Sequence, residues 1–301
     1  MPSPIAHVRT PETCFASLPD YPWAARYIDS LPSLNGLRMH FLDEGPRDAP
    51  VTWLCLHGNP AWSYLYRRMI PIFLTQGHRV VAPDMPGFGR SDKPLAEGQH
   101  TFTWHRNVLL ELVEQLDLRN VNLVVQDWGG LIGLTLPPEA PQRYRGLLVM
   151  NTCLATATET LPEGFLHWRT MCRSKPDFSI ARLFARGNPH MTEAECSAYD
   201  APFPNADYRA ATRKFPEMVP EEPDADGVAV SRRAALFWSN EWTGRSMMAV
   251  GMRDPVFSLA LMEQLGKSIR GCPSPMAIAN GGHFVQEHGE LIAIEALRLL
   301  A

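Results

Sequence analysis

The sequence predicts an α/β fold, in which helices cover both faces of a mainly parallel sheet. Three observations support this prediction. Short apolar or β-branched runs alternate with longer segments of helical pattern through most of the chain. The 301 residues are 45% hydrophobic and 20% charged, the balance of a globular protein that buries a sizeable core. The alternation breaks in one long stretch, which indicates an insertion, although length alone leaves one or two domains open.

The predicted elements follow one another in the order expected for such a sheet. The strands are residues 51–56, 79–82, 121–125, 145–150, 246–250 and 275–279. The helices are residues 63–76, which Gly77 ends, residues 102–118, a helix that begins within 131–136, and the amphipathic segment 287–300. Continuous apolar runs such as VTWLCL are typical of strands buried on both faces.

The stretch after Asn151 differs from the rest of the chain. Residues 155–226 are rich in proline, charge and aromatic side chains, and they contain helical patterns without a convincing central strand. Strand patterns return only at residues 246–250. We therefore expect a discontinuous core domain, residues 1–153 and 227–301, and an inserted helical cap domain, residues 154–226.

Charge and cysteine content exclude several classes of partner. The formal net charge is -4 and no dense block of Lys or Arg occurs, so we expect neither a nucleic acid nor a membrane as partner. The first residues lack a secretory signal pattern, and no apolar stretch approaches the roughly 20 residues that a spanning helix needs. Six cysteines are scattered without CxxC pairs or metal-ligand spacing, which favours free thiols in the cytoplasm.

A strand, a sharp turn and a helix meet at residues 126–130, QDWGG. This is the context of the nucleophile elbow of α/β hydrolases, in which a strained turn lifts one side chain above the sheet. Asp127 stands where serine is usual, and two glycines let the new helix pass close to the strand. Val125 departs from the small residue expected at the first position. The alternative interpretation is that Asp127 only caps a helix.

A second loop points to the same site. The sequence HGNP, residues 57–60, follows the first predicted strand, where α/β hydrolases place the loop that supplies one oxyanion-hole N–H. We assign that backbone N–H to Asn59 and the second one to Trp128, the residue after the nucleophile. A plain turn is the alternative interpretation of these four residues.

Asp254 and His283 complete the predicted catalytic set. Asp254 follows the strand at 246–250 within GMRDP, and His283 follows the last strand within GGHF. The chain order nucleophile, acid, histidine is the order that this fold uses. The chain has ten histidines, so His283 is distinguished by its place after the final strand and by the glycine pair before it.

Several motifs together resemble those of the haloalkane dehalogenases. They are HGNPAWSYLYRRMIP, DMPGFGRSDKP, QDWGG, APFP, RKFP and GGHFVQEHGE, and they are spread over most of the chain, including the cap. The resemblance is strongest to the branch in which the acid follows the strand after the cap, as Asp254 does, and in which two tryptophans hold the halide. Other branches carry the acid where this chain has the neutral Asn151.

The resemblance implies a halide site. It places the first halide-binding tryptophan at Trp128 and the second at Trp168, within the Phe-x-x-Trp pattern of residues 165–168. Core packing is the alternative explanation of a Phe and a Trp three residues apart on a helix. The branch often has an acidic residue where this chain has Asn59, while other branches use an asparagine side chain there as a halide donor. Asn59 is therefore a third candidate donor.

The resemblance also implies a reaction, the hydrolysis of a carbon–halogen bond in a small haloalkane to a primary alcohol, halide and a proton. An aspartate carboxylate, with an ordinary pKa of ~3.9, is an anion suited to displacement at saturated carbon. We expect Asp127 to form an alkyl ester, which water activated by His283 then cleaves while Asp254 supports the imidazolium. No step requires a metal or an organic cofactor, and we expect a monomer or a homodimer.

Two other functions stay open as alternatives. An epoxide hydrolase uses the same Asp-Trp elbow but needs cap tyrosines to protonate the epoxide oxygen, for which Tyr199 and Tyr208 are available. A non-catalytic binding protein on the same scaffold is the second alternative. A serine esterase is excluded, because Asp127 cannot form the usual acyl-enzyme.

Overall fold

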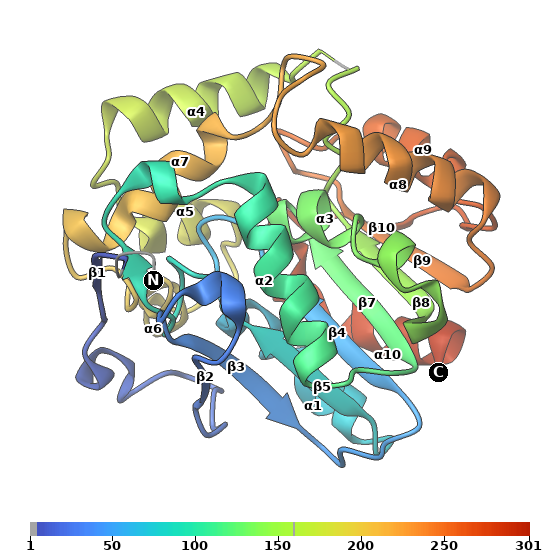
Figure 1. The fold of residues 1–301 in the computed structure, drawn as a ribbon, viewed down its shortest axis with the longest axis horizontal. Helices are drawn as coiled ribbons and strands as arrows, with labels where there is room; N and C mark the ends of the chain where they lie inside the picture. The colour runs from blue at the N-terminus through green and yellow to red at the C-terminus, as the bar shows by residue number, and fades with distance from the viewer. Residues whose placement is uncertain (1–4, 159) are drawn as a thin grey trace.

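A mixed sheet of eight strands forms the centre of the computed structural model, which describes residues 5–158 and 160–301 (Figure 1). The strand order is β10-β9-β8-β7-β4-β5-β3-β2. The strands are β2 (Arg26–Ile28), β3 (Met39–Glu44), β4 (Thr52–Leu56), β5 (Arg79–Pro83), β7 (Val121–Gln126), β8 (Tyr144–Met150), β9 (Arg245–Gly251) and β10 (Met276–Ile278). Two further strands, β1 (His7–Val8) and β6 (Lys93–Pro94), form a separate antiparallel pair.

All neighbours from β5 through β4, β7, β8 and β9 to β10 are parallel, whereas β3 pairs antiparallel with β5 and with β2. Every residue of β4 and β7 is buried, which explains their continuous apolar sequences. The carboxyl ends of parallel strands lie at one edge of the sheet. The loops that follow β4, β7, β9 and β10 are therefore brought together there.

Helices cover both faces of the sheet, as the sequence predicts. The helices α1 (Ile70–Leu74) and α10 (Gly289–Leu300) pack together on one face, and α2 (Phe102–Gln115) and α3 (Trp128–Gly133) cover the other (Figure 1). The helix α2 begins where the Thr101 side chain accepts the N–H of Trp104. The helix α9 (Leu259–Lys267) packs beside β9.

Two predictions about the first part of the chain differ from the structure. The single helix expected at 63–76 is instead a 3-10 turn, η3 (Ser63–Tyr66), and the short α1. Pro71 lies in the first turn of α1, and because proline has no N–H and clashes with a preceding helical turn, it favours the start of a new helix over the continuation of an earlier one. The strands β2 and β3 were not predicted, since MHFLDE mixes apolar and polar residues without regular alternation.

The chain between β8 and β9 is helical. It forms α4 (Glu163–Ser174), α5 (Ile180–Gly187), α6 (Glu193–Ala198), α7 (Ala210–Glu217) and α8 (Val228–Asn240), with no strand among its described residues. Figure 1 shows α4, α5 and α7 beyond the carboxyl ends of the strands. By contrast, α8 packs on the core, where the Trp238 indole donates to the carbonyl of Leu134 at 2.9 Å.

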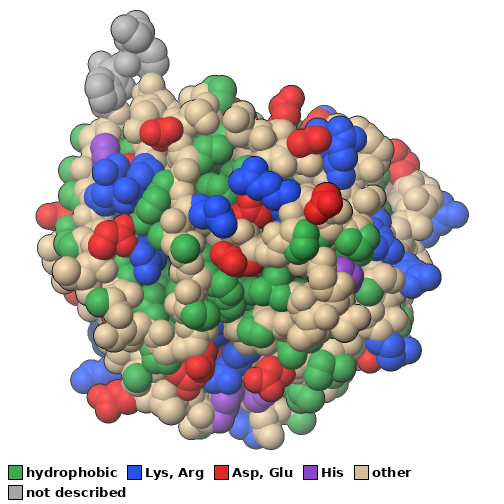
Figure 2. Space-filling model, turned by 90° about the horizontal axis from the view of Figure 1, so that it is seen from below, with side chains coloured by type: hydrophobic (Ala, Val, Ile, Leu, Met, Phe, Trp, Pro, Cys, Tyr) green, Lys and Arg blue, Asp and Glu red, His purple; other side chains and the backbone are tan. Residues whose placement is uncertain are grey.

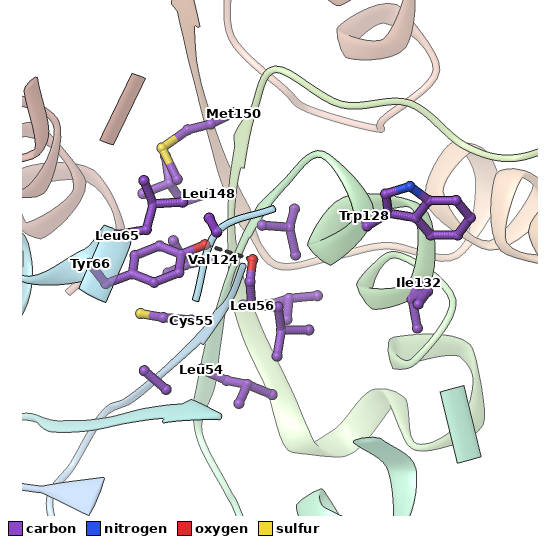
Figure 3. Close-up of a cluster of buried hydrophobic side chains, with 14 of the residues drawn as sticks. Leu54, Cys55, Leu56, Leu65, Tyr66, Val124, Trp128, Ile132, Leu148 and Met150 are labelled. Carbon is purple, nitrogen blue, oxygen red and sulfur yellow. Dashed lines mark hydrogen bonds between the residues drawn. The ribbon is translucent and has the colours of Figure 1, made fainter. Parts of the chain in front are cut away.

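The core directly below the elbow is closely packed. Figure 3 shows side chains of β4, β7 and β8, among them Leu56, Val124 and Leu148, packed together, with the Tyr66 hydroxyl donating to the carbonyl of Leu56 at 2.7 Å. All four of these side chains are completely buried. The ends of β4 and β7 are therefore held in place from within the core.

The surface carries charges of both signs. Figure 2 shows Lys and Arg side chains interspersed with Asp and Glu on the face seen from below, in agreement with the small net charge. None of the helices in the described part of the chain combines the length and the apolar character needed to cross a bilayer.

Candidate active site

Asp127 lies between β7 and α3 in a strained backbone conformation. Its φ of 49° and ψ of -127° lie where residues other than glycine are rarely found, as expected at a nucleophile elbow. Its side chain makes no capping hydrogen bond to α3, so the helix-cap interpretation does not describe it. Instead, Oδ1 accepts the backbone N–H of Asn59 at 2.8 Å, and 17% of the side chain is exposed. The turn therefore presents the carboxylate outward.

Close approach of α3 to β4 and β7 explains the residues around the elbow. A Cβ on Gly129 would lie 2.0 Å from the carbonyl oxygen of Leu56, so only glycine fits there. Val125 is larger than the pattern predicts, and Gly133 packs against it, because a Cβ on Gly133 would lie 2.9 Å from Cγ1 of Val125 and 2.8 Å from Cδ1 of Leu56. The extra volume in the strand is therefore matched by missing volume in the helix.

The structure brings Asp127, Asp254 and His283 together. Nδ1 of His283 lies 2.9 Å from Oδ2 of Asp254, and Nε2 lies 3.5 Å from Oδ2 of Asp127. Gln126, which the sequence analysis did not single out, donates to the carbonyl of His283 at 3.1 Å, and its amide nitrogen lies 3.0 Å from Nε2. The only signal for Gln126 in the sequence is its place directly before the nucleophile.

Asp254 is fully buried and well supplied with donors. Its Oδ2 accepts the side-chain N–H of Asn151 at 2.7 Å, and its Oδ1 accepts the backbone N–H of Val256 at 2.7 Å. Burial alone would raise the pKa of this carboxyl, but the charge and hydrogen bonds of its neighbours, His283 foremost, lower it. Asn151 is fixed in turn by the backbone N–H of Gly251 at 2.9 Å. The carboxylate is thus held ionised and oriented toward the histidine.

His283 lies between two carboxylates. Burial lowers the pKa of its imidazole, but Asp254 and then Asp127 outweigh that effect and raise the pKa to about 10. The ring stacks against Phe257, with centroids 5.9 Å apart, and contacts Phe284 edge-on at 4.9 Å. The two carboxylates therefore stabilise the protonated form of His283, and the aromatic rings hold it in a fixed orientation.

The loop at residues 57–60 passes directly beside the nucleophile. A Cβ on Gly58 would lie 2.3 Å from Oδ1 of Asp127, and the next residue, Asn59, donates its backbone N–H to that oxygen. Nε2 of His57 accepts the backbone N–H of Met85 at 2.9 Å, which ties the loop to the end of β5. The loop therefore does more than reverse the chain, because it directs an N–H at the carboxylate.

The side chain of Asn59 contacts helix α7, which belongs to the helical segment between β8 and α8. Its amide nitrogen lies 3.4 Å from the carbonyl of Thr212 in α7, a long hydrogen bond, and its buried Oδ1 has no partner among the described residues. The amide group has a second N–H, and Asn59 borders the pocket described next.

A pocket of about 840 Å³ lies over the elbow, between the core loops and helices α4 and α5. Its polar floor contains Asn59, Asp127 and His283. Its walls are apolar and are formed by Phe165, Trp168, Met171, Leu183, Val256 and Phe284. Exposed charged or ionisable side chains line its outer part, namely Glu163, His167, Arg186 and Arg253. Across the described residues, no group of three or more His, Cys, Asp or Glu side chains is placed to hold a metal ion.

Both predicted halide-binding tryptophans line this pocket. Trp128 is buried and contacts Phe215 of α7 edge-on, with centroids 4.9 Å apart. Trp168 of α4 is half-buried and contacts Phe178 edge-on at 5.3 Å. Neither indole N–H donates to any described residue, whereas the buried Trp238 indole does. An indole N–H is a donor only, so two unused donors at one pocket suit an anion.

The tyrosines weighed for epoxide opening lie elsewhere. Tyr199 is completely buried, and its hydroxyl donates to Glu287 rather than into the pocket. Tyr208 is half-buried and does not border the pocket either. No tyrosine in the described part of the chain is among the pocket residues, so the site offers no phenol to protonate an epoxide oxygen.

The comparisons with known proteins agree with this geometry and confirm the predicted fold class. The α/β hydrolase fold family matches residues 53–290. A haloalkane dehalogenase of Psychrobacter cryohalolentis is 44% identical over 292 residues, 95% of each chain, and one of Mycobacterium marinum is 42% identical over 93% of this chain and 94% of its own. The solved haloalkane dehalogenase DpaA from Paraglaciecola agarilytica, described as tetrameric, has a TM-score of 0.94 at 47% identity and 98% coverage of each chain. The chain belongs to the α/β hydrolase fold family and, within it, to the haloalkane dehalogenases.

Proposed function

We propose that this protein hydrolyses the carbon–halogen bond of small haloalkanes to a primary alcohol, a halide ion and a proton. The observation that carries the proposal is the position of the Asp127 carboxylate, partly exposed at the elbow in an apolar-walled pocket that Trp128 and Trp168, whose indole N–H groups have no partner among the described residues, also line. A carboxylate nucleophile gives a hydrolysable ester with an alkyl halide, and the indoles supply donors for the leaving halide.

The first step is displacement at carbon. An oxygen of Asp127 attacks the carbon that bears the halogen, the carbon–halogen bond breaks, and the halide leaves with the bonding electron pair. The N–H groups of Trp128 and Trp168 stabilise the charge that grows on the halide, with the Asn59 side chain as a third donor. A positioned donor of this kind supplies about 2.7–4 kcal/mol toward a transition state.

The second step is hydrolysis of the ester. His283 takes a proton from a water molecule, which attacks the carbonyl carbon of the Asp127 ester, while the backbone N–H groups of Asn59 and Trp128 stabilise the oxyanion. Collapse of this intermediate expels the alcohol, which takes a proton from the imidazolium. The carboxyl group of Asp127 then loses its proton, and Asp254 holds the imidazole in one orientation throughout.

The two steps are linked through the charge on Asp127. In the free enzyme both carboxylates raise the pKa of His283. Formation of the alkyl ester makes Asp127 neutral and removes one of these charges, so the pKa of His283 falls and the imidazolium loses its proton more readily. The histidine therefore becomes a base when the ester that needs it is present.

The helical segment closes the pocket, and we propose that residues 154–226 act as a cap domain on the core formed by residues 1–153 and 227–301. The helices α4 and α5 supply most of the apolar wall, and a wall of this kind excludes water from the displacement step. The segment contacts the core closely, because a Cβ on Gly164 would lie 2.0 Å from the carbonyl oxygen of Pro255.

We further propose a cytoplasmic location, since all six cysteines are free thiols, the state that a reducing compartment maintains. Cell fractionation of the source organism tests it. We propose a monomer or a homodimer as the assembly of this chain, although the relative from Paraglaciecola agarilytica is described as tetrameric. Light scattering on the purified protein distinguishes the three states.

A direct comparison of substrates tests the proposed function. The purified protein is incubated with 1,2-dibromoethane and, separately, with styrene oxide, and bromide release and diol formation are measured. We expect bromide and 2-bromoethanol from the first substrate and no diol above background from the second. Turnover of the epoxide alone would contradict the proposal, and turnover of neither, by a folded protein, would favour the non-catalytic alternative.

A further inference from the structure

A buried polar cluster lies behind the pocket, outside the residues that act on the substrate. We call it the brace and define it as Arg67, Glu195, Tyr199 and Glu287. Both carboxylate oxygens of Glu287 accept from the guanidinium of Arg67 at 2.7 Å, and the Tyr199 hydroxyl donates to the same carboxylate. Arg67 also donates to Glu195 at 2.9 Å. The side chains of Arg67 and Glu287 are completely buried, so these bonds are made away from bulk water.

The brace joins three separate parts of the fold. Arg67 follows η3 in the core. Glu195 lies within α6 of the helical segment, and Tyr199 directly follows that helix. Glu287 lies in a 3-10 turn, η8 (Val285–His288), that starts two residues after His283. The loop that carries the general base is therefore fastened through Glu287 to both the core and the helical segment.

An aromatic stack runs from the brace to the histidine. The ring of Phe184, in α5, stacks on Tyr199 with centroids 3.4 Å apart and on Phe284 with centroids 4.0 Å apart. Phe284 in turn contacts the ring of His283. A side chain of the helical segment also contacts the backbone of the loop, since Nε2 of His190 lies 3.2 Å from the carbonyl oxygen of Glu287. The base is thus supported by the helical segment through rings as well as hydrogen bonds.

We propose that Tyr199 and Glu287 are positioning residues for the hydrolytic half of the reaction. They hold the loop of residues 282–288 so that Nε2 of His283 directs water at the ester of Asp127. This inference rests on the proposed function, in which His283 acts only in ester hydrolysis. Loosening the brace therefore slows the second step and leaves the first step, which uses Asp127 and the two tryptophans, nearly unchanged.

Tyr199→Phe is the variant that separates positioning from folding. It keeps the ring that stacks on Phe184, and it leaves Glu287 paired with Arg67, so no buried charge loses its partner. Tyr21→Phe is the matched control, because the hydroxyl of Tyr21 is also buried and hydrogen-bonded, to Ser63 at 2.6 Å, outside the brace. Glu287→Gln is a second variant, and it weakens the same hydrogen bonds more strongly because it removes the charge of the carboxylate.

The experiment resolves the two steps with 1-bromobutane. Rapid-quench measurement of bromide gives the rate of alkylation, and intact-protein mass spectrometry during turnover gives the fraction present as butyl ester. For Tyr199→Phe we expect alkylation within about twofold of the parent enzyme, and ester hydrolysis slower by about tenfold, with more ester at steady state. Glu287→Gln is expected to shift the same ratio further, and Tyr21→Phe to leave it unchanged.

Several results would overturn the inference. Unchanged rates of both steps in Tyr199→Phe, with only a lower melting temperature, would make the brace purely structural, and an equal fall in both steps would make its effect unspecific. Failure of the parent enzyme to release bromide would instead remove the proposed function itself, and with it this inference. Bromide release by the parent enzyme therefore distinguishes a failure of this inference from a failure of the proposed function.

Discussion

The sheet edge and the helix α4 both contribute to the pocket, but they are held in different ways. Asp127, Asp254 and His283 follow the ends of β7, β9 and β10, strands fixed by a parallel ladder and a buried core. Trp168 lies on α4, where only Phe165 and Cys172 are buried. The reacting groups are therefore supported by the sheet, whereas Trp168 is supported by a helix that buries few of its own side chains.

Ion pairs at the surface illustrate the difference. In α4, Arg169 pairs with Glu221 at 2.7 Å and Arg173 pairs with Glu217, and each pair has at least one strongly exposed partner. Exposed pairs of this kind contribute about 0–1 kcal/mol each. The comparison teaches that the chemistry is set by the sheet edge, while the fit to a particular haloalkane depends on pocket residues of α4, a helix with few buried side chains.

The largest effect should come from the sheet edge itself. In Asp127→Asn the nucleophile is a neutral amide, so we expect halide release to fall at least about 10³-fold. Asparagine has nearly the shape of aspartate, and its Oδ1 can still accept the backbone N–H of Asn59, so the melting temperature should change little. Halide release from 1-bromobutane measures the effect. Activity within tenfold of the parent enzyme would place the nucleophile elsewhere.

The two tryptophans allow a direct comparison of the two regions, because Trp128 lies at the sheet edge and Trp168 lies on α4. Trp128→Phe and Trp168→Phe each remove one indole donor and keep an aromatic ring, so we expect alkylation to slow by about 10²- to 10³-fold in each. Only Trp128→Phe should also destabilise the protein, because Trp128 is buried against Phe215. Rapid-quench bromide release and thermal melts give the two readouts. An unchanged alkylation rate in Trp168→Phe would exclude α4 from the halide site.

A change in the helical wall should alter substrate preference more than it alters chemistry. Met171→Ala widens the pocket beside Trp168, so we expect the kcat/KM ratio of 1-bromohexane to 1-bromopropane to rise by about tenfold. Leu236→Ala, at an exposed position on α8 outside the pocket, is the control and should leave the ratio unchanged. Equal ratios in both variants would mean that α4 does not set chain-length preference.

The smallest effect should be on stability and its dependence on pH. His283 has a pKa raised from 6.5 to about 10 in the folded protein, so its contribution is fully present below pH 6.5 and is lost as the pH rises through about 10. We expect the free energy of unfolding of the parent enzyme to decline, relative to that of His283→Gln, over this range. Urea unfolding at several pH values measures both proteins. If the free energies of unfolding of the two proteins changed with pH in parallel, the carboxylates would not stabilise the imidazolium in the folded protein.

The same division between the sheet edge and the helices explains what the sequence could predict. The fold class followed from strand patterns that depend on local burial, and Asp127 and His283 stood out because glycine-rich turns follow or precede them. The role of Gln126 and the brace of Tyr199 and Glu287 could not be predicted, since they depend on contacts between segments far apart in the chain.

The most direct test of the mechanism is to isolate its covalent intermediate. In His283→Gln the first step should proceed and the second should stop, so exposure to 1-bromobutane should release one bromide per active site and leave a butyl group on the protein. Intact mass and peptide mapping then locate the group, and the account predicts that it lies on Asp127. A butyl group on another residue, or bromide release without any covalent adduct, would contradict it.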